Sequence, residues 1–117
     1  MGVVATKSFS FALEIIKLYK FLSLEKREFV MSKQVLRSGT SVGALIREAE
    51  HAQSRADFLH KMNVALKEAN ETEYWLMLLV ESDYIDKNQY QLLMSSCKSI
   101  LRLLISIVNT TKTSLRR

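Results

Sequence analysis

Apolar residues recur along the chain at alternating spacings of three and four, the period of one face of an α-helix. Four segments carry this pattern, and we expect helices over about 8–22, 26–53, 55–82 and 87–113. The alternation favours nearly parallel helix axes in a left-handed bundle. The positions expected to face the core are Phe11, Ile15, Leu18 and Leu22, then Val35, Gly39, Val42, Ile46 and Ala49, then Phe58, Met62, Ala65, Ala69, Thr72, Leu76 and Leu79, and finally Leu93, Cys97, Ile100, Leu104, Ile107 and Thr111.

The junctions between these segments carry residues that cap helices. Ser54 followed by Asp57, and Asp86 followed by Gln89, have the spacing of a capping box. Both junctions are short, and short connections place neighbouring helices antiparallel. The sequence therefore predicts an all-α fold, an antiparallel up-down-up-down four-helix bundle, with residues 1–117 forming a single domain.

The composition agrees with long helices. The chain of 117 residues is 48% hydrophobic and contains no proline, three glycines and one cysteine. Cys97 cannot form an internal disulfide, which suits a reducing cytoplasm. The longest apolar runs are far shorter than the roughly 20 residues that span a bilayer, so we expect no membrane partner.

Two glycines interrupt the second predicted helix. Gly39 and Gly43 are spaced i, i+4, and each interior glycine costs a helix roughly 0.5–1 kcal/mol relative to alanine. A close contact must compensate. We expect a bulky partner such as Tyr74 or Trp75 to pack there, either inside the bundle or between subunits. Arg37-Ser38-Gly39-Thr40-Ser41 also offers phosphate donors, but it lacks the Gly-Lys-Ser/Thr ending of a Walker loop.

The middle of the chain strongly resembles the four-helix bundle proteins encoded in intervening sequences of bacterial 23S ribosomal RNA genes. The resemblance is carried by Arg37-Ser38-Gly39-Thr40-Ser41-Val42-Gly43-Ala44, then Ser54, Asp57-Phe58 and Lys61, and then Lys67-Glu68-Ala69, Glu71-Thr72 and Tyr74-Trp75-Leu76. The family is similar to the accessory variability determinant of diversity-generating retroelements, a basic partner of a reverse transcriptase.

The resemblance implies a bundle that assembles into a ring-like homopentamer and has no assigned catalytic residues and no cofactor. It also implies a link to RNA and a protein partner such as a reverse transcriptase. Where family members carry an Asn and then a Glu after Gly-Ala, this chain has Leu45, Ile46 and Arg47. The departure concerns packing or surface charge at this turn rather than the fold.

Charge is distributed unevenly along the chain. The net charge is +5, and the segment from Lys87 to the end contains basic residues but no acid. A basic final helix can bind RNA or DNA through phosphate contacts. The same residues can instead simply solvate a surface. We find no base-reading module, so any binding would be non-specific. The candidate nucleic-acid-binding residues are Lys98, Arg102, Lys112, Arg116 and Arg117.

Acidic residues gather in the third predicted helix. We expect Glu68, Glu71 and Glu73 to pair with Arg37, Arg47 or a neighbouring subunit rather than to act as a general acid and base, which would need a pocket and perturbed pKa values.

Metal binding is the sharper enzymatic alternative. Glu48-x-x-His51 has the spacing used in di-iron bundles, and Asp57-x-x-His60 follows it. These motifs flank the turn near Ser54 instead of facing each other within a core. We therefore predict no metal site, with both histidines on surfaces or in cap contacts.

Two functions from different classes remain. The favoured one is a non-enzymatic oligomeric adaptor that binds RNA or DNA through basic surfaces, together with a protein partner. The alternative is a protein-interaction scaffold whose positive charge is incidental.

Overall fold

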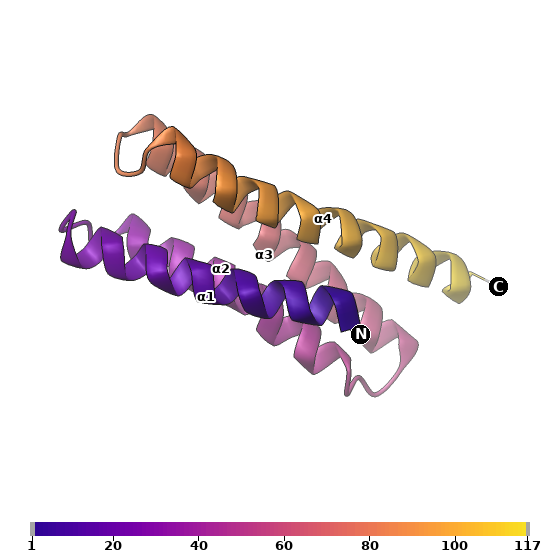
Figure 1. The fold of residues 1–117 in the computed structure, drawn as a ribbon. Coiled ribbons are helices and arrows are strands. Elements are labelled where there is room, and N and C mark those ends of the chain that lie inside the picture. Colours follow the sequence, from indigo (N-terminus) through magenta and orange to yellow (C-terminus); the bar gives the residue numbers. More distant parts are fainter. Residues whose placement is uncertain (1, 117) are drawn as a thin grey trace.

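The computed structural model describes residues 2–116, and this range contains four helices and no strand. The helices are α1 (Gly2–Leu24), α2 (Met31–Ala49), α3 (Arg55–Glu81) and α4 (Lys87–Leu115). Each helix runs antiparallel to the one before it, and together they form an elongated body of 51 × 21 × 21 Å (Figure 1). The expected all-α architecture of four helices is confirmed.

The core follows the predicted stripes closely. Every expected core position in α1 and α2 is buried, and Ile15, Leu22, Val35, Val42 and Ile46 have no exposed surface. In α3 and α4 the buried residues are the expected ones with three exceptions, the first of which is Met94, a buried residue of α4 outside the predicted stripe. Phe58 is half-buried, and near the end of α4 the chain buries Val108 while Ile107 is half-buried. The spacing of three and four therefore identified the buried face of each helix.

Helices α1 and α2 are in tight contact at Gly39. A Cβ atom at this position would lie 2.8 Å from Cγ1 and 2.9 Å from Cγ2 of Ile15, closer than real Cβ contacts. A Cβ at Gly43, one turn further along, would lie 3.4 Å from the Ser8 hydroxyl oxygen, an ordinary contact. The compensating contact expected for Gly39 is thus the Ile15 side chain of α1.

Helix α2 meets α3 through a buried polar contact. The Thr72 hydroxyl donates a hydrogen bond to the Ser38 hydroxyl at 2.9 Å, and both side chains are fully buried. Thr72 also lies 2.8 Å from the carbonyl oxygen of Glu68, and the Ser41 hydroxyl is satisfied by the carbonyl of Ser38. The small residues of α2 therefore contact both neighbouring helices: Gly39 packs against α1, and Ser38 forms a hydrogen bond with α3.

The expected start of the second helix at residue 26 is wrong, because α2 begins at Met31. Arg27 has a φ of 54°, the left-handed region, which ends the preceding helical geometry. The buried Glu28 carboxylate then accepts hydrogen bonds from the backbone N–H groups of Val30, Met31 and Ser32, the last at 2.7 Å. A carboxylate at this end satisfies orphan N–H groups and favours the helix dipole.

The other helix ends also differ in places from expectation. Helix α1 begins at Gly2 instead of residue 8, since Val4 extends its buried face by a turn, and α2 ends at Ala49 instead of residue 53. Helices α3 and α4 agree with the prediction within two residues.

The predicted caps form. Asp86 and Gln89 make a complete capping box, with Asp86 accepting from the Gln89 N–H at 2.7 Å. Ser54 accepts from the Asp57 N–H at 3.0 Å, while the Asp57 carboxylate reaches past the cap to the Gln53 N–H.

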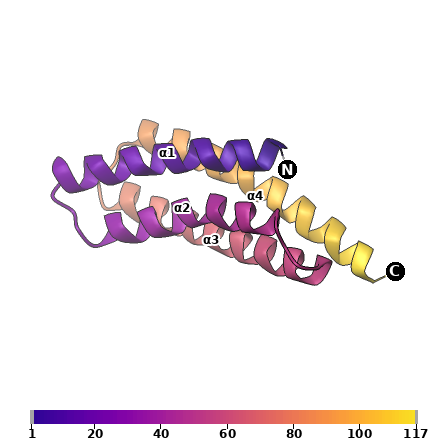
Figure 2. The same ribbon diagram turned by 90° about the horizontal axis from the view of Figure 1, so that it is seen from below.

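The end of α4 extends past the first turn of α1 (Figure 2). Lys112 and Arg116 lie in this last part of the helix and are exposed. The architecture therefore presents the basic end of the chain at one end of the bundle, where it is not covered by α1.

We predict that Gly39→Ala destabilises the fold by about 1–3 kcal/mol, because the new methyl overlaps the fully buried Ile15 and the helix gain of about 1 kcal/mol cannot offset overpacking. Gly43→Ala is the matched control, with one added methyl in the same helix. It should leave the free energy of unfolding unchanged or raise it by up to about 1 kcal/mol. Urea unfolding followed by circular dichroism measures both, and equal effects would contradict the assigned contact.

Candidate nucleic-acid interface

The predicted basic residues of α4 fall on one exposed face of the helix. Lys98, Arg102, Lys112 and Arg116 are all exposed, and Ile105 and Asn109 complete the same alternation of four and three between them. At 1.5 Å per residue, the stripe from Lys98 to Arg116 is roughly 27 Å long. We call the six positions Lys98, Arg102, Ile105, Asn109, Lys112 and Arg116 the α4 stripe. Arg117, the fifth predicted basic residue, lies outside the described residues.

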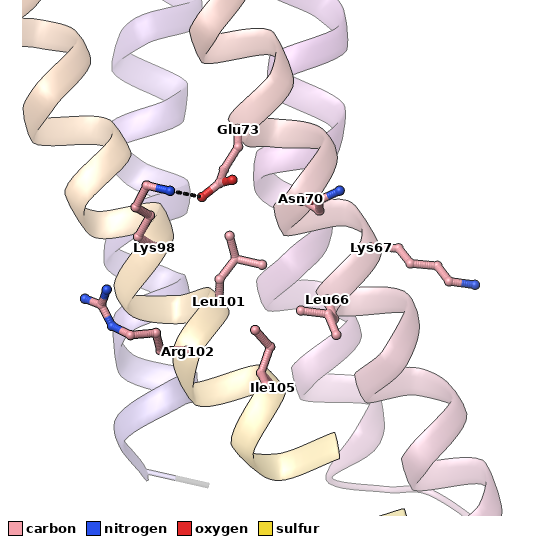
Figure 3. Close-up of a pocket in the computed structure, with 8 residues that line it drawn as sticks. All are labelled: Leu66, Lys67, Asn70, Glu73, Lys98, Leu101, Arg102 and Ile105. Carbon is pink, nitrogen blue, oxygen red and sulfur yellow. Dashed lines mark ion pairs between the residues drawn. The ribbon is translucent and has the colours of Figure 1, made fainter. Parts of the chain in front are cut away.

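The first part of the α4 stripe borders an open groove between α3 and α4. The groove has a volume of about 530 Å³. Figure 3 shows its two walls: Leu101 and Ile105 of α4 and Leu66 of α3 lie between the helices, while Lys67 and Arg102 extend outward at the edges. We call this feature the α3/α4 groove; it is lined by Leu66, Lys67, Asn70 and Glu73 of α3 and by Lys98, Leu101, Arg102 and Ile105 of α4.

An ion pair closes one end of the α3/α4 groove. Nζ of Lys98 lies 3.4 Å from Oε2 of Glu73, and the Glu73 side chain is only 17% exposed (Figure 3). This oxygen is buried and has no hydrogen-bond partner within residues 2–116, so the contact with Lys98 is electrostatic without hydrogen-bond alignment. Arg102, Lys112 and Arg116 form no ion pair within the described range. Most of the stripe's positive charge is therefore not neutralised locally.

Two other acids of α3, Glu68 and Glu71, pair with α2. Nη1 of Arg37 contacts the two carboxylate oxygens of Glu68 at 3.2 and 3.0 Å, and Nη2 of Arg37 pairs with Glu71. The Trp75 indole N–H also donates to Glu71, at 2.8 Å. The expectation that Glu68 and Glu71 pair with Arg37 is confirmed. Glu73 pairs instead with Lys98, a basic partner that we did not anticipate.

The predicted aromatic partners of the glycine helix lie elsewhere. The three atoms nearest to the Cβ position of Gly39 all belong to Ile15, not to Tyr74 or Trp75. Tyr74 is 55% exposed and meets Trp75 edge to face, with ring centroids 5.4 Å apart. Trp75 is half-buried against the core. The expectation that these rings pack on Gly39 inside the bundle is therefore wrong, because Ile15 of α1 occupies that space, while their packing between subunits stays a prediction.

The residues with metal-ligand spacing have other partners. Glu48 and Asp57 both approach Nζ of Lys61, at 3.5 and 4.0 Å, and His51 and His60 are exposed. Residues 2–116 contain no group of three or more His, Cys, Asp or Glu side chains that could hold a metal ion. Lys61 thus balances the acids on either side of the α2–α3 turn.

Cys97 is a buried neutral thiol in the core of α4. Its Sγ lies 3.4 Å from the carbonyl oxygen of Ala69. Desolvation by burial, and secondarily the nearby Glu73 carboxylate, raises the pKa of the thiol from 9.0 to about 12. The thiolate, which is the reactive form, is therefore strongly disfavoured in the folded protein.

By length and composition, α4 passes the test for a membrane-spanning helix, the only helix within residues 2–116 that does so. A core helix of a water-soluble bundle passes the same test. Here the apolar positions Leu93, Cys97, Ile100 and Leu104 pack into the bundle core. This packing accounts for part of the apolar composition, since 33% of the candidate window is buried in the bundle.

The α3/α4 groove itself was missed from the sequence. The basic residues of α4 were recognised, but Leu66, Leu101 and Ile105 were not separated from other apolar positions. One signal was present: Ile105 continues the spacing of Lys98 and Arg102 on the face opposite the predicted core stripe. A single exposed apolar residue is ordinary on a protein surface, so Ile105 becomes informative only beside Leu66 and Leu101 in the groove.

Comparisons with known proteins place these features in a family. A family model described as 23S rRNA-intervening sequence protein matches residues 3–106. The crystal structure of a protein with unknown function from the S23 ribosomal protein family of Bacteroides thetaiotaomicron VPI-5482 is 62% identical to this chain. It superposes with a TM-score of 0.90, and the match covers 91% of this chain and 98% of that one. A comparison with curated proteins gave no match.

We predict that Cys97 reacts with a thiol reagent at pH 8 only when the protein unfolds, because the folded thiol is buried and has a pKa of about 12. The unfolded thiol ionises near pH 9 while the folded thiol stays protonated, so this contribution to stability is complete below pH 9 and is lost progressively toward pH 12. The assay uses a thiol reagent that releases a coloured leaving group, one per chain when Cys97 reacts. The rate of this release is compared with the rate of unfolding in urea. Fast stoichiometric labelling of the native protein would contradict the burial.

Proposed function

The chain belongs to the 23S rRNA-intervening sequence protein family, and from this premise we propose that it is a non-enzymatic adaptor that binds RNA or DNA through the α4 stripe. The description of the matching family names no catalytic activity, and the similar Bacteroides protein is described as having unknown function. The proposal therefore rests on the surface of this chain. The observation that carries it is the alignment of Lys98, Arg102, Lys112 and Arg116 on one exposed face.

The electrostatics of this face support a polyanionic ligand. No acid occurs from Lys87 to the end of the sequence, and the acids of α3 are paired with Arg37 and Lys98. Arg102, Lys112 and Arg116 therefore have no nearby negative charge on their own helix to compete with a phosphate. Phosphate contacts of this kind do not read sequence, so we propose non-specific binding.

Self-assembly is the second part of the proposal. Helix α1 exposes Val3, Phe9 and Leu13, at 62%, 63% and 48%. Phe9 also borders an open groove between α1 and α2, beside Thr40, Gly43 and Ala44. Apolar side chains exposed along one helix are typical of an interface between subunits. We propose that copies of the chain associate through this α1 surface into the ring-like pentamer that the family resemblance implies.

The alternative function is a protein-interaction scaffold without a nucleic-acid role, and the same α1 surface favours it. Under that alternative the α4 stripe only keeps the surface solvated. A protein partner, such as a reverse transcriptase, is compatible with either function. Nucleic-acid binding is thus the property that separates the two.

We predict that the protein binds RNA and DNA with an affinity that falls steeply with salt, and that replacing Arg102, Lys112 and Arg116 with glutamine weakens binding. Loss of three phosphate contacts should lower the slope of log affinity against log salt by about two. Fluorescence anisotropy of a labelled oligonucleotide, titrated at several salt concentrations, gives the slope directly.

The matched control removes three charges elsewhere, by replacing Lys20, Lys33 and Arg55 with glutamine on α1, α2 and α3. All three side chains are exposed, so the net charge falls equally while the α4 stripe stays intact. The control should keep most of the salt slope. If both triple variants lose affinity for the oligonucleotide equally, binding depends on net charge alone. If the wild-type protein does not bind even at low salt, the scaffold function is favoured.

We also predict that Phe9→Glu combined with Leu13→Glu reduces the assembly to smaller species, because charges on a buried apolar interface lack compensating partners. Sedimentation velocity measures the change in mass. Leu24→Glu, an exposed leucine at the other end of α1, is the control and should leave the mass unchanged. A wild-type protein that sediments as a monomer at micromolar concentration would refute the assembly proposal.

A further inference from the structure

We propose that the α3/α4 groove holds an unpaired segment of nucleic acid, so that the protein prefers single strands to duplexes. The inference rests on the proposed function and names the form of nucleic acid that the site accepts. The groove places apolar side chains, cationic side chains and an ion-paired carboxylate that accepts no hydrogen bond within one short stretch of two antiparallel helices (Figure 3).

The floor of the groove is apolar. Leu66, Leu101 and Ile105 line it, and Ile105 is 46% exposed to solvent. A duplex presents phosphates at its surface and keeps its base faces stacked inside, so it would leave this floor uncovered. An unpaired strand can lay a base face against the floor while its phosphates remain at the rim.

The rim carries the charge that such a strand requires. Lys98 and Arg102 are one helical turn apart on α4, roughly 6 Å along the axis, and Lys67 stands on the α3 wall. Against these three cations the groove holds one acid, Glu73, so its lining has a net positive charge. The spacing of Lys98 and Arg102 is comparable with the separation of successive phosphates on an extended strand.

The closed end of the groove holds an acceptor with unused hydrogen-bonding capacity. Oε2 of Glu73 is buried and accepts no hydrogen bond, its ion-pair partner Nζ of Lys98 lies 3.4 Å away, and Asn70 lines the same wall. The edges of unpaired bases carry N–H groups that can donate to such an acceptor. An acidic amphipathic helix, the other ligand that suits an apolar floor with a basic rim, offers ionised carboxylates, which have no N–H or O–H to donate to Glu73. Glu73 therefore favours a base over an acidic peptide.

The experiment compares single and double strands on a variant of the floor. The probe is a labelled RNA of about 12 nucleotides with alternating A and C, which cannot pair with itself, used alone and annealed to its complement. Ile105→Gln removes apolar surface without changing charge. Leu92→Gln, at an even more exposed leucine of α4 that lies outside this groove, is the matched control. Circular dichroism verifies that both variants fold.

The wild-type protein should bind the single strand at least about tenfold more tightly than the duplex. Ile105→Gln should weaken single-strand binding about three- to tenfold with an unchanged salt slope, and should leave duplex binding unaffected. Leu92→Gln should behave as wild type.

Equal affinity for the two forms, or identical behaviour of the two glutamine variants, would overturn the inference while salt-dependent binding still supported the adaptor. Absence of binding to either form at low salt would overturn both proposals. The last probe is an acidic amphipathic helical peptide with leucines on one face and glutamates on the other. Its binding is measured on the same variants. Tighter binding of this peptide than of the RNA, lost in Ile105→Gln, would assign the groove to an acidic helix and overturn the inference.

Discussion

The close approach of α1 to α2 at Gly39 is the constraint on which the rest of the bundle depends. Ile15 fills the space that a side chain at this position would occupy. The preceding residue, Ser38, lies about 100° from Gly39 around the helix axis, and its hydroxyl accepts a hydrogen bond from Thr72 of α3. Adjacent residues of α2 therefore fix two neighbouring helices at once. Small side chains at these positions allow tight contact on both sides, which explains why a helix with two interior glycines is stable here.

The arrangement of charge follows from this packing. Because α3 lies against α2 on one side and α4 on the other, its acids are divided between Arg37 and Lys98. Arg102 and Lys112 of α4 lie further along the helix and form no ion pair with these carboxylates. A chain whose net charge is only +5 thereby presents one distinctly basic face. Burial contributes to this separation, since the face of α4 that carries Cys97, Ile100 and Leu104 is committed to the core.

The sequence predicted the features that depend on one helix at a time. These features are the apolar stripes, the Asp86–Gln89 capping box and the bounds of α3 and α4. Each is local to one helix, so periodicity or cap spacing reveals it. Features that depend on contacts between segments were missed. Glu28 caps α2 only because Arg27 turns the chain back, and Ile15 meets Gly39 only because α1 packs there. The α3/α4 groove likewise needs the pairing of two helices, which composition does not contain.

The two proposed surfaces can function together because they lie on opposite sides of the bundle. Contacts link each helix to its neighbours in the order α1, α2, α3, α4 and back to α1, so the outer side of the α1–α2 pair is opposite that of the α3–α4 pair. Association through Phe9 and Leu13 would leave every copy of the α4 stripe accessible. A single stripe of four cations binds weakly at physiological salt, but several copies on one strand raise the effective concentration of each further contact. Assembly would therefore convert a weak, non-specific surface into a tight one without any new residue.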